Sequence, residues 1–169
     1  ENIERMGYKV TRVLSPKTDL LKIITEFYGF RSSVTAAAKE IASEVDLGNL
    51  EQFVKMKSVS EIEATDKHVV NAVEFLFRYA FDQRASDIHV EPKRDSSEVR
   101  LRIDGMLHTI HKVPKAVHPA MVSRIKMLSR MDIAEKRRPQ DGRIKTDFKG
   151  REVELRVSTM PVAFGEKVV

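Results

Sequence analysis

The most constraining stretch of this sequence is a pair of alternating segments joined by a two-residue turn. Over residues 98–103 apolar and charged side chains alternate without a break, the pattern of a strand with one buried and one solvated face. Asp104-Gly105 follows, a dipeptide that favours tight hairpins because both residues tolerate positive φ. Residues 106–113 then supply the return strand. The sequence therefore predicts an antiparallel hairpin, which needs further elements packed against it to be stable.

Similar signals predict elements on both sides of this hairpin. An amphipathic helix over 66–80 begins at Thr65 or Asp66, either of which can cap it. A second helix is expected after Pro119, through residue 128. Short strands are expected at 88–90, 143–148 and 151–159, with turns at Asp141-Gly142 and Lys149-Gly150. This order predicts an α+β fold, a mainly antiparallel sheet with helices on one face.

The first sixty residues carry weaker signals. Residues 8–13 alternate like a strand, and a helix is expected to open at Ser15-Pro16 and to end at Gly29. One strand and one helix bury too little surface to stand alone. We therefore expect residues 1–31 to be the C-terminal tail of a preceding domain, residues 32–62 to be a helix (33–45) and a linker, and residues 63–169 to be the main domain.

Composition limits the classes of function. A content of 41% hydrophobic and 33% charged residues suits a soluble protein with a core, and no apolar window is long enough to span a membrane. The absence of cysteine from the sequence excludes disulfides and thiolate metal sites. Residues 65–169 carry 21 basic against 15 acidic side chains. Such an excess indicates either an anionic partner, such as nucleic acid, phospholipid or nucleotide phosphate, or a merely solvated surface.

Three ionisable residues alternate in the stretch Ala-Ser-Asp-Ile-His-Val-Glu-Pro at 85–92. On a strand Asp87, His89 and Glu91 would share one face, because successive side chains point to opposite sides. Such a triplet could bind a metal ion or work as an acid–base pair. The alternative is structural, with Asp87 capping a turn and His89 hydrogen-bonded in a polar patch. No other residues of the chain have the spacing of metal ligands.

Arginines stand out in two further motifs. Arg137 and Arg138 precede Pro139 and so belong to a helix end or a loop, because the residue before proline favours extended geometry. The same motif continues to Arg143. Arg156 alternates with apolar neighbours on the predicted strand 151–159 and faces solvent or a partner. Guanidinium groups bind phosphate or carboxylate through paired hydrogen bonds; the alternatives are an exposed basic loop and a cross-strand salt bridge.

The sequence contains no G-x-x-x-x-G-K-[ST] motif. Gly165-Glu-Lys167 has a lysine after a glycine but lacks the second glycine and the following Ser or Thr. Without that loop the chain has no ready cradle for the β- and γ-phosphates. The 169 residues alone are therefore not expected to hydrolyse ATP.

Taken together, five motifs in order resemble the ATPase family that drives type II secretion and type IV pilus assembly. They are Ala-Ser-Asp-Ile-His-Val-Glu-Pro at 85–92, Arg-Ile-Asp-Gly at 102–105, Ser-Arg-Ile-Lys at 123–126, Asp-Ile-Ala-Glu-Lys-Arg-Arg-Pro-Gln-Asp-Gly-Arg-Ile at 132–144, and Arg-Val-Ser-Thr-Met-Pro at 156–161 with Gly-Glu-Lys-Val-Val at 165–169. Residues 1–29, ending in Phe-Tyr-Gly, look like the end of the domain that comes before in this family.

The resemblance implies that residues 63–169 are the second N-terminal domain of such an ATPase, a PAS-like α+β unit placed before a RecA-like domain. In the family the enzyme is a cytoplasmic homohexamer, associated with the inner membrane through secretion or pilus platform proteins. ATP and Mg²⁺ are held by the RecA-like domain, so none is expected tightly bound to this chain, and no metal site or nucleic acid is expected. The parent protein would be an ATP hydrolase and the chain its regulatory and assembly region.

The same resemblance assigns roles to the motif residues. By motif position Arg156 is an arginine that reaches the nucleotide phosphates when this domain closes on the RecA-like domain, and a second such arginine is expected just after Val169. Arg137, Arg138 and Arg143 are expected at an interface or in structuring a loop. Asp87, His89 and Glu91 become a structural signature.

Two other classes of function remain as alternatives. The first is a basic adaptor that binds nucleic acid, but the chain has no Trp, only three Tyr and no aromatic side chains among its basic cluster. The second is a metal-dependent enzyme using Asp87, His89 and Glu91, which metal analysis and a His89→Ala variant would test.

Overall fold

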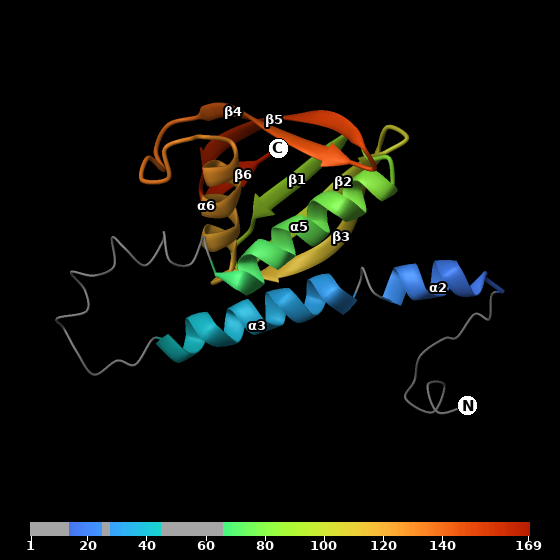
Figure 1. The fold of residues 1–169 in the computed structure, drawn as a ribbon. Coiled ribbons are helices and arrows are strands. Elements are labelled where there is room, and N and C mark those ends of the chain that lie inside the picture. Colours follow the sequence, from blue (N-terminus) through green and yellow to red (C-terminus); the bar gives the residue numbers. More distant parts are fainter. Residues whose placement is uncertain (1–13, 25–27, 45–65) are drawn as a thin grey trace.

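The computed structural model describes residues 14–24, 28–44 and 66–169. Within them, six strands form one antiparallel sheet in the order β3-β2-β1-β6-β5-β4, with helices packed on one face (Figure 1). This arrangement confirms the predicted α+β class. The strands are β1 (Asp87–Pro92), β2 (Ser96–Ile103), β3 (Met106–Pro114), β4 (Gln140–Phe148), β5 (Arg151–Val162) and β6 (Gly165–Val168). The helices are α2 (Lys17–Ile23), α3 (Gly29–Glu44), α5 (Lys67–Asp82) and α6 (His118–Leu128).

Two tight turns set the register of the sheet, as predicted. Asp104 and Gly105 have φ values of 48° and 82° and join β2 to β3. Lys149 and Gly150, at 54° and 78°, join β4 to β5. Residues with positive φ give a turn whose twist matches that of the strands it connects. The strands beyond the second turn are paired residue by residue, and those beyond the first are too, except for a register shift between Val99 and Arg100.

The short strand β6 connects the two halves of the sheet. It pairs with β5 through residues 165–168 but with β1 only where Val168 lies opposite Val90. Val90, Val168 and Thr159 lie side by side and all face the helices. The opposite side of the sheet is therefore one continuous surface, which no described helix covers.

The core lies between the sheet and α5 and α6. Asp66 caps α5 by accepting hydrogen bonds from the backbone N–H groups of His68 (2.5 Å) and Val69 (3.2 Å), a typical N-cap. Below this cap α5 buries a stripe at helical spacing, and each such side chain contributes roughly 1.5–3 kcal/mol. The buried apolar residues of α5, α6 and the sheet are Val69, Ala72, Val73, Leu76, Ala80, Val90, Val99, Leu101, Val113, Ala120, Met121, Val122, Ile125, Ile144, Val157 and Val168.

The predicted turn at Asp141-Gly142 is wrong, because β4 runs straight through both residues. Gly142 lies against the end of α6: a Cβ there would come within 2.9 Å of the Ser129 Cβ and within 3.1 Å of the Met131 side chain. A glycine inside a strand often marks such a close approach. The glycine at position 142 is thus required for close packing against the end of α6 and not for a turn.

The expected end of a helix at Gly29 and the start of the next at residue 33 are also wrong, because α3 already begins at Gly29. The Phe30 ring is buried and stacks on His111 of β3, with ring centroids 4.3 Å apart. Gly29 lies against Phe75 of α5, where a Cβ would come within 2.9 Å of the ring. These two contacts hold the first turn of α3 against α5 and β3. The predicted strand at 8–13 and the predicted linker at 46–63 fall outside the described residues.

Helix α6 begins one residue before Pro119, which occupies its first turn. Proline is well tolerated there because the N–H groups of the first turn have no intrahelical partner. No helix in the described ranges combines the length and the apolar character that crossing a membrane requires.

Candidate functional site

The candidate site lies on the side of the sheet opposite the helices, which we call the open face. Its side chains alternate along each strand with the core residues, so their orientation follows from the strand pattern. Most of them are charged, and the face therefore consists mainly of ion pairs. The open face comprises Asp87, His89 and Glu91 of β1, Arg100 and Arg102 of β2, Lys167 of β6, Glu152, Glu154, Arg156 and Ser158 of β5, and Asp141, Arg143 and Lys145 of β4.

Glu91 is the centre of the densest group of charges. Its carboxylate lies 2.7 Å from Arg100, 3.0 Å from Lys167 and 3.5 Å from Lys93. Burial alone would raise the pKa of Glu91, but the hydrogen bonds and positive charges of Arg100 and Lys167 outweigh it and lower the pKa to about 2. The group is therefore ionised at any physiological pH and joins three strands electrostatically.

Asp87 and His89, the other members of the triplet, have different surroundings. Asp87 accepts hydrogen bonds from Arg102 (3.0 Å) and from the Ser86 hydroxyl (2.9 Å). The expectation that His89 is hydrogen-bonded is wrong: both its ring nitrogens are buried without a hydrogen-bond partner, although Nδ1 lies 3.7 Å from Glu91. Burial and the charge of Lys167 lower the pKa of His89, which favours the neutral imidazole.

The triplet is arranged as a structural network rather than as a set of metal ligands. Both carboxylates are already neutralised by arginine or lysine at short distance, whereas a metal would need them free. In the described part of the chain, no group of three or more His, Asp or Glu side chains is placed to hold a metal ion. The structural-signature role of Asp87, His89 and Glu91 stays a prediction.

Arg156 and Arg143 lie directly opposite each other on β5 and β4. Both side chains are exposed, and residues facing each other in this way have Cβ atoms about 4.5–5.5 Å apart. Arg143 donates to Glu154 at 3.0 Å. Over the residues that the structure describes, the Arg156 side chain makes no hydrogen bond or ion pair. It is thus an unneutralised cation on a face where its neighbours are paired.

The other two predicted arginines lie apart, in the loop between α6 and β4. The backbone N–H of Arg137 donates to the Glu135 carboxylate at 2.7 Å, and the exposed Arg138 guanidinium lies 3.8 Å from the same carboxylate. Gln140 holds the loop closed through hydrogen bonds of 3.0 Å to the carbonyls of Asp132 and Glu135. The loop is ordered by its backbone contacts, and both guanidinium groups point to solvent.

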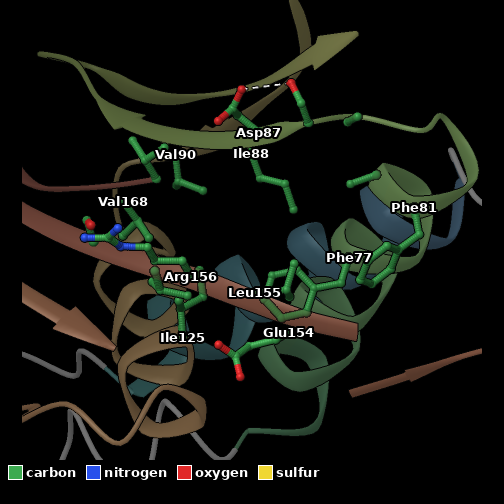
Figure 2. A pocket seen from close by; sticks show the side chains of 16 residues that line it. Phe77, Phe81, Asp87, Ile88, Val90, Ile125, Glu154, Leu155, Arg156 and Val168 are labelled. Atoms are coloured by element: carbon green, nitrogen blue, oxygen red, sulfur yellow. Dashed lines mark hydrogen bonds between the residues drawn. The ribbon is translucent and has the colours of Figure 1, made fainter. Parts of the chain in front are cut away.

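A cavity of about 370 Å³ opens beside Arg156, between β1 and β5 where β6 does not separate them. Figure 2 shows the two strands on either side, with Phe77 and Phe81 of α5 behind them. Apolar side chains such as Ile88 and Leu155 line its depth, whereas Arg156, Glu154 and Asp87 line it from the open-face side. The cavity thus joins a polar rim to an apolar floor.

The sequence reading missed a buried ion pair behind the open face. Lys126 of α6 is 1% exposed and pairs with Glu166 of β6, which is also buried. Its ammonium group donates a further hydrogen bond of 2.6 Å to the Glu135 carbonyl. One lysine therefore connects α6, β6 and the loop that carries Arg137. A signal existed, because Lys126 follows Val122 by four residues and so lies on the apolar stripe of its helix.

Comparison with known proteins identifies the family of the chain. A family profile described as "Type II/IV secretion system protein" matches residues 63–169, well over half of the sequence. The chain belongs to this family of secretion and pilus assembly ATPases. The resemblance carried by the five motifs is thereby confirmed.

Individual members of the family are similar over almost the whole chain. It is 43% identical over 162 residues to the type IV pilus assembly ATPase TfpB of Acinetobacter baylyi, covering 95% of this chain and 28% of TfpB. It is 37% identical over 164 residues to the type IV pilus assembly ATPase PilB of Thermus thermophilus (97% and 17%). It is 40% identical over 153 residues to the type II secretion system protein HxcR of Pseudomonas aeruginosa (89% and 32%). The chain spans less than a third of these family members.

Proposed function

We propose that this chain is the N-terminal regulatory and assembly region of a motor ATPase that powers type II secretion or type IV pilus assembly. In this proposal the region closes on a RecA-like domain, and Arg156 reaches the phosphates of the ATP bound there. The single observation that carries the proposal is the state of Arg156. It is exposed and lacks an acidic partner among the described residues, while Arg100, Arg102 and Arg143 on the same face are each paired.

The chemistry proposed for Arg156 is electrostatic. Phosphoryl transfer accumulates negative charge on phosphate oxygens, and an arginine placed against them is worth about 10³–10⁵ in rate in other enzymes. A guanidinium mounted on a strand is held more rigidly than one on a loop, because the sheet fixes its backbone. Arg156 lies in the middle of β5, which is hydrogen-bonded to β4 along this stretch. It is therefore suited to precise contact with a phosphate group.

The proposal locates the rest of the nucleotide site outside these residues. The sequence has no P-loop, and the described residues present no cluster of carboxylates for Mg²⁺. ATP and Mg²⁺ would be held by the RecA-like domain, and this chain would contribute positive charge. The relatives named pilus assembly ATPases support this division of labour, since the chain corresponds to only part of each. We further propose a cytoplasmic homohexamer that docks to inner-membrane platform proteins.

The proposal is tested by measuring Mg²⁺-dependent ATP hydrolysis in four proteins. They are this chain, the same gene product continued past Val169, and that longer form carrying either Arg156→Ala or Lys145→Ala. Lys145 is a matched control, because it is an exposed cation of the same face paired with Glu152 at 3.4 Å. We expect hydrolysis only in the longer forms and a loss of at least about 10³-fold with Arg156→Ala, with nucleotide still bound and with Lys145→Ala unaffected.

Two results would overturn the proposal. If the longer form does not hydrolyse ATP at any concentration, even with membrane partners present, the chain is part of a binding module. Its basic surface would then be the candidate binding site, and polynucleotide binding that falls steeply with salt would favour the nucleic-acid adaptor. If Arg156→Ala and Lys145→Ala reduce hydrolysis equally, Arg156 has no specific role at the phosphates.

A further inference from the structure

The hairpin between β4 and β5 places two arginines directly opposite each other, an arrangement that does not stabilise the fold. Its turn pairs Arg143 with Arg156, and like charges directly opposite each other on a sheet destabilise the pairing. Both side chains lie on the open face and are exposed. The register of the hairpin fixes the backbone positions of both residues, so the two side chains start from adjacent points of the same face.

The two arginines differ in their acidic partners. Glu154 is bound to Arg143 at 3.0 Å. The next carboxylate on β4, Asp141, accepts a hydrogen bond from the Ser158 hydroxyl at 2.5 Å instead of facing an arginine. Glu152, two residues before Glu154 on β5, forms an ion pair with Lys145 at 3.4 Å. Within the described residues Arg143 thus has an acidic partner and the Arg156 side chain has none, although the Asp141 carboxylate lies diagonally across from it on β4. Arg156 also lines the cavity shown in Figure 2.

We infer that Arg143 and Arg156 together form one anion-binding site, whose ligand is the terminal phosphates of a nucleoside triphosphate. The choice of ligand rests on the function proposed above, whereas the two-arginine site rests on the register of β4 and β5. Guanidinium groups on adjacent strands can each donate two N–H groups to phosphate oxygens. Arg143 is thereby a second phosphate contact, a role different from the interface or loop role that its motif position implies.

Glu154 has a defined part in this site. It holds Arg143 while no anion is present, and the phosphate competes with it for the same guanidinium group. Removing the carboxylate should therefore strengthen anion binding, but only while Arg143 is there to be released. That dependence distinguishes competition for Arg143 from a general increase in positive charge.

The inference is tested on the chain itself with inorganic tripolyphosphate as the probe. At 19.3 kDa the labelled protein is suited to NMR, and the arginine Nε–Hε signals report binding directly. Because exposed ion pairs are screened by salt, all titrations use one low ionic strength. The variants are Arg143→Gln, Arg156→Gln, Glu154→Gln and the double variant Arg143→Gln/Glu154→Gln. Thermal unfolding of each checks that the fold is intact.

Two further variants match the charge changes on the same face. Lys145→Gln removes one positive charge two residues from Arg143, and Glu152→Gln removes one negative charge two residues from Glu154. We expect Arg143→Gln and Arg156→Gln each to weaken binding about tenfold or more, the effect of losing one charge-assisted hydrogen bond. We expect Glu154→Gln to strengthen tripolyphosphate binding about twofold to threefold. Lys145→Gln should change the affinity less than the two arginine variants do, and Glu152→Gln should change it less than Glu154→Gln does.

The outcome distinguishes this inference from the proposed function. If Arg156→Gln weakens binding and Arg143→Gln does no more than Lys145→Gln, the two-arginine site is refuted while the role of Arg156 survives. If Glu154→Gln strengthens binding equally in the Arg143→Gln background, competition for Arg143 is refuted. If neither arginine variant exceeds Lys145→Gln, the open face has no specific phosphate site and the inference is refuted, whereas the role proposed for Arg156 is judged separately by ATP hydrolysis in the longer form.

Discussion

Replacing Lys126 by methionine is predicted to be among the most destabilising single changes to this domain. Methionine preserves the length and the apolar stem of the side chain but removes the ammonium group that pairs with Glu166. Both partners are buried, so the change leaves a carboxylate in the core with no opposite charge. Breaking a buried ion pair in this way costs about 3–5 kcal/mol. Losing the hydrogen bond to the Glu135 carbonyl adds about 1 kcal/mol.

Urea unfolding at neutral pH measures this loss. A small domain loses about 2 kcal/mol of stability per molar urea, so we expect the Lys126→Met midpoint to fall by about 2–3 M. The exposed Lys145 provides the control: Lys145→Met removes a lysine paired at 3.4 Å but should cost less than about 1 kcal/mol, because surface ion pairs contribute little.

The double variant Lys126→Met/Glu166→Met tests the physical reason. If the cost comes from an orphaned carboxylate, removing that carboxylate should restore most of the stability, to within about 2 kcal/mol of the wild type. A double variant no more stable than Lys126→Met would refute the reasoning and assign the loss to packing. So would a Lys126→Met variant that unfolds at the wild-type urea concentration.

Three further predictions concern the same domain. Hydrogen bonds from Arg100 and Lys167 depress the pKa of Glu91 to about 2, so the stabilising contribution of its carboxylate is present above pH 4.5 and is lost as the pH falls toward 2. Urea midpoints of the wild type and of Glu91→Gln, measured from pH 7 to pH 2, should therefore converge as the pH falls from 4.5 to 2. Gly142→Ala should cost about 1–3 kcal/mol in thermal unfolding, since its Cβ meets Ser129, whereas Gly150→Ala has open space and loses only the freedom of positive φ, about 1 kcal/mol; an equal loss in both would contradict the close approach. Phe30→Ala removes the ring stacked on His111, so the amides of α3 should lose hydrogen-exchange protection while those of β2 keep theirs; unchanged α3 protection would mean that Phe30 does not hold the helix in place.

Local patterns in the sequence were sufficient for most of the sheet. The alternation over residues 98–103 and the turns at Asp104-Gly105 and Lys149-Gly150 act over a few residues, and the structure follows them. Gly142 shows the limit of such signals, because a glycine needed for close approach is indistinguishable in sequence from a glycine needed for a turn. Only the distant Ser129 decides between the two.

The pairing of the two arginines could have been predicted from the sequence but was not. A two-residue turn at 149–150 fixes every partner along β4 and β5, and counting outward from it brings Arg143 opposite Arg156. The buried state of Lys126 is different. Its position on the apolar stripe of α6 hints at burial, but its partners come from β6 and from the Glu135 carbonyl, which no local pattern locates.

Stability alone does not account for the arginine at position 156. Exposed ion pairs contribute at most about 1 kcal/mol each, so folding gains little from the pairs of the open face and loses little from an unpaired cation. The arginine opposite Arg143 is nevertheless unfavourable for the hairpin, and an uncharged residue would fit the same exposed strand position. A feature that slightly disfavours the fold needs a cause outside it. The anion binding that we propose would supply that cause, because the same positive charge that weakens the free hairpin would strengthen its complex with phosphate.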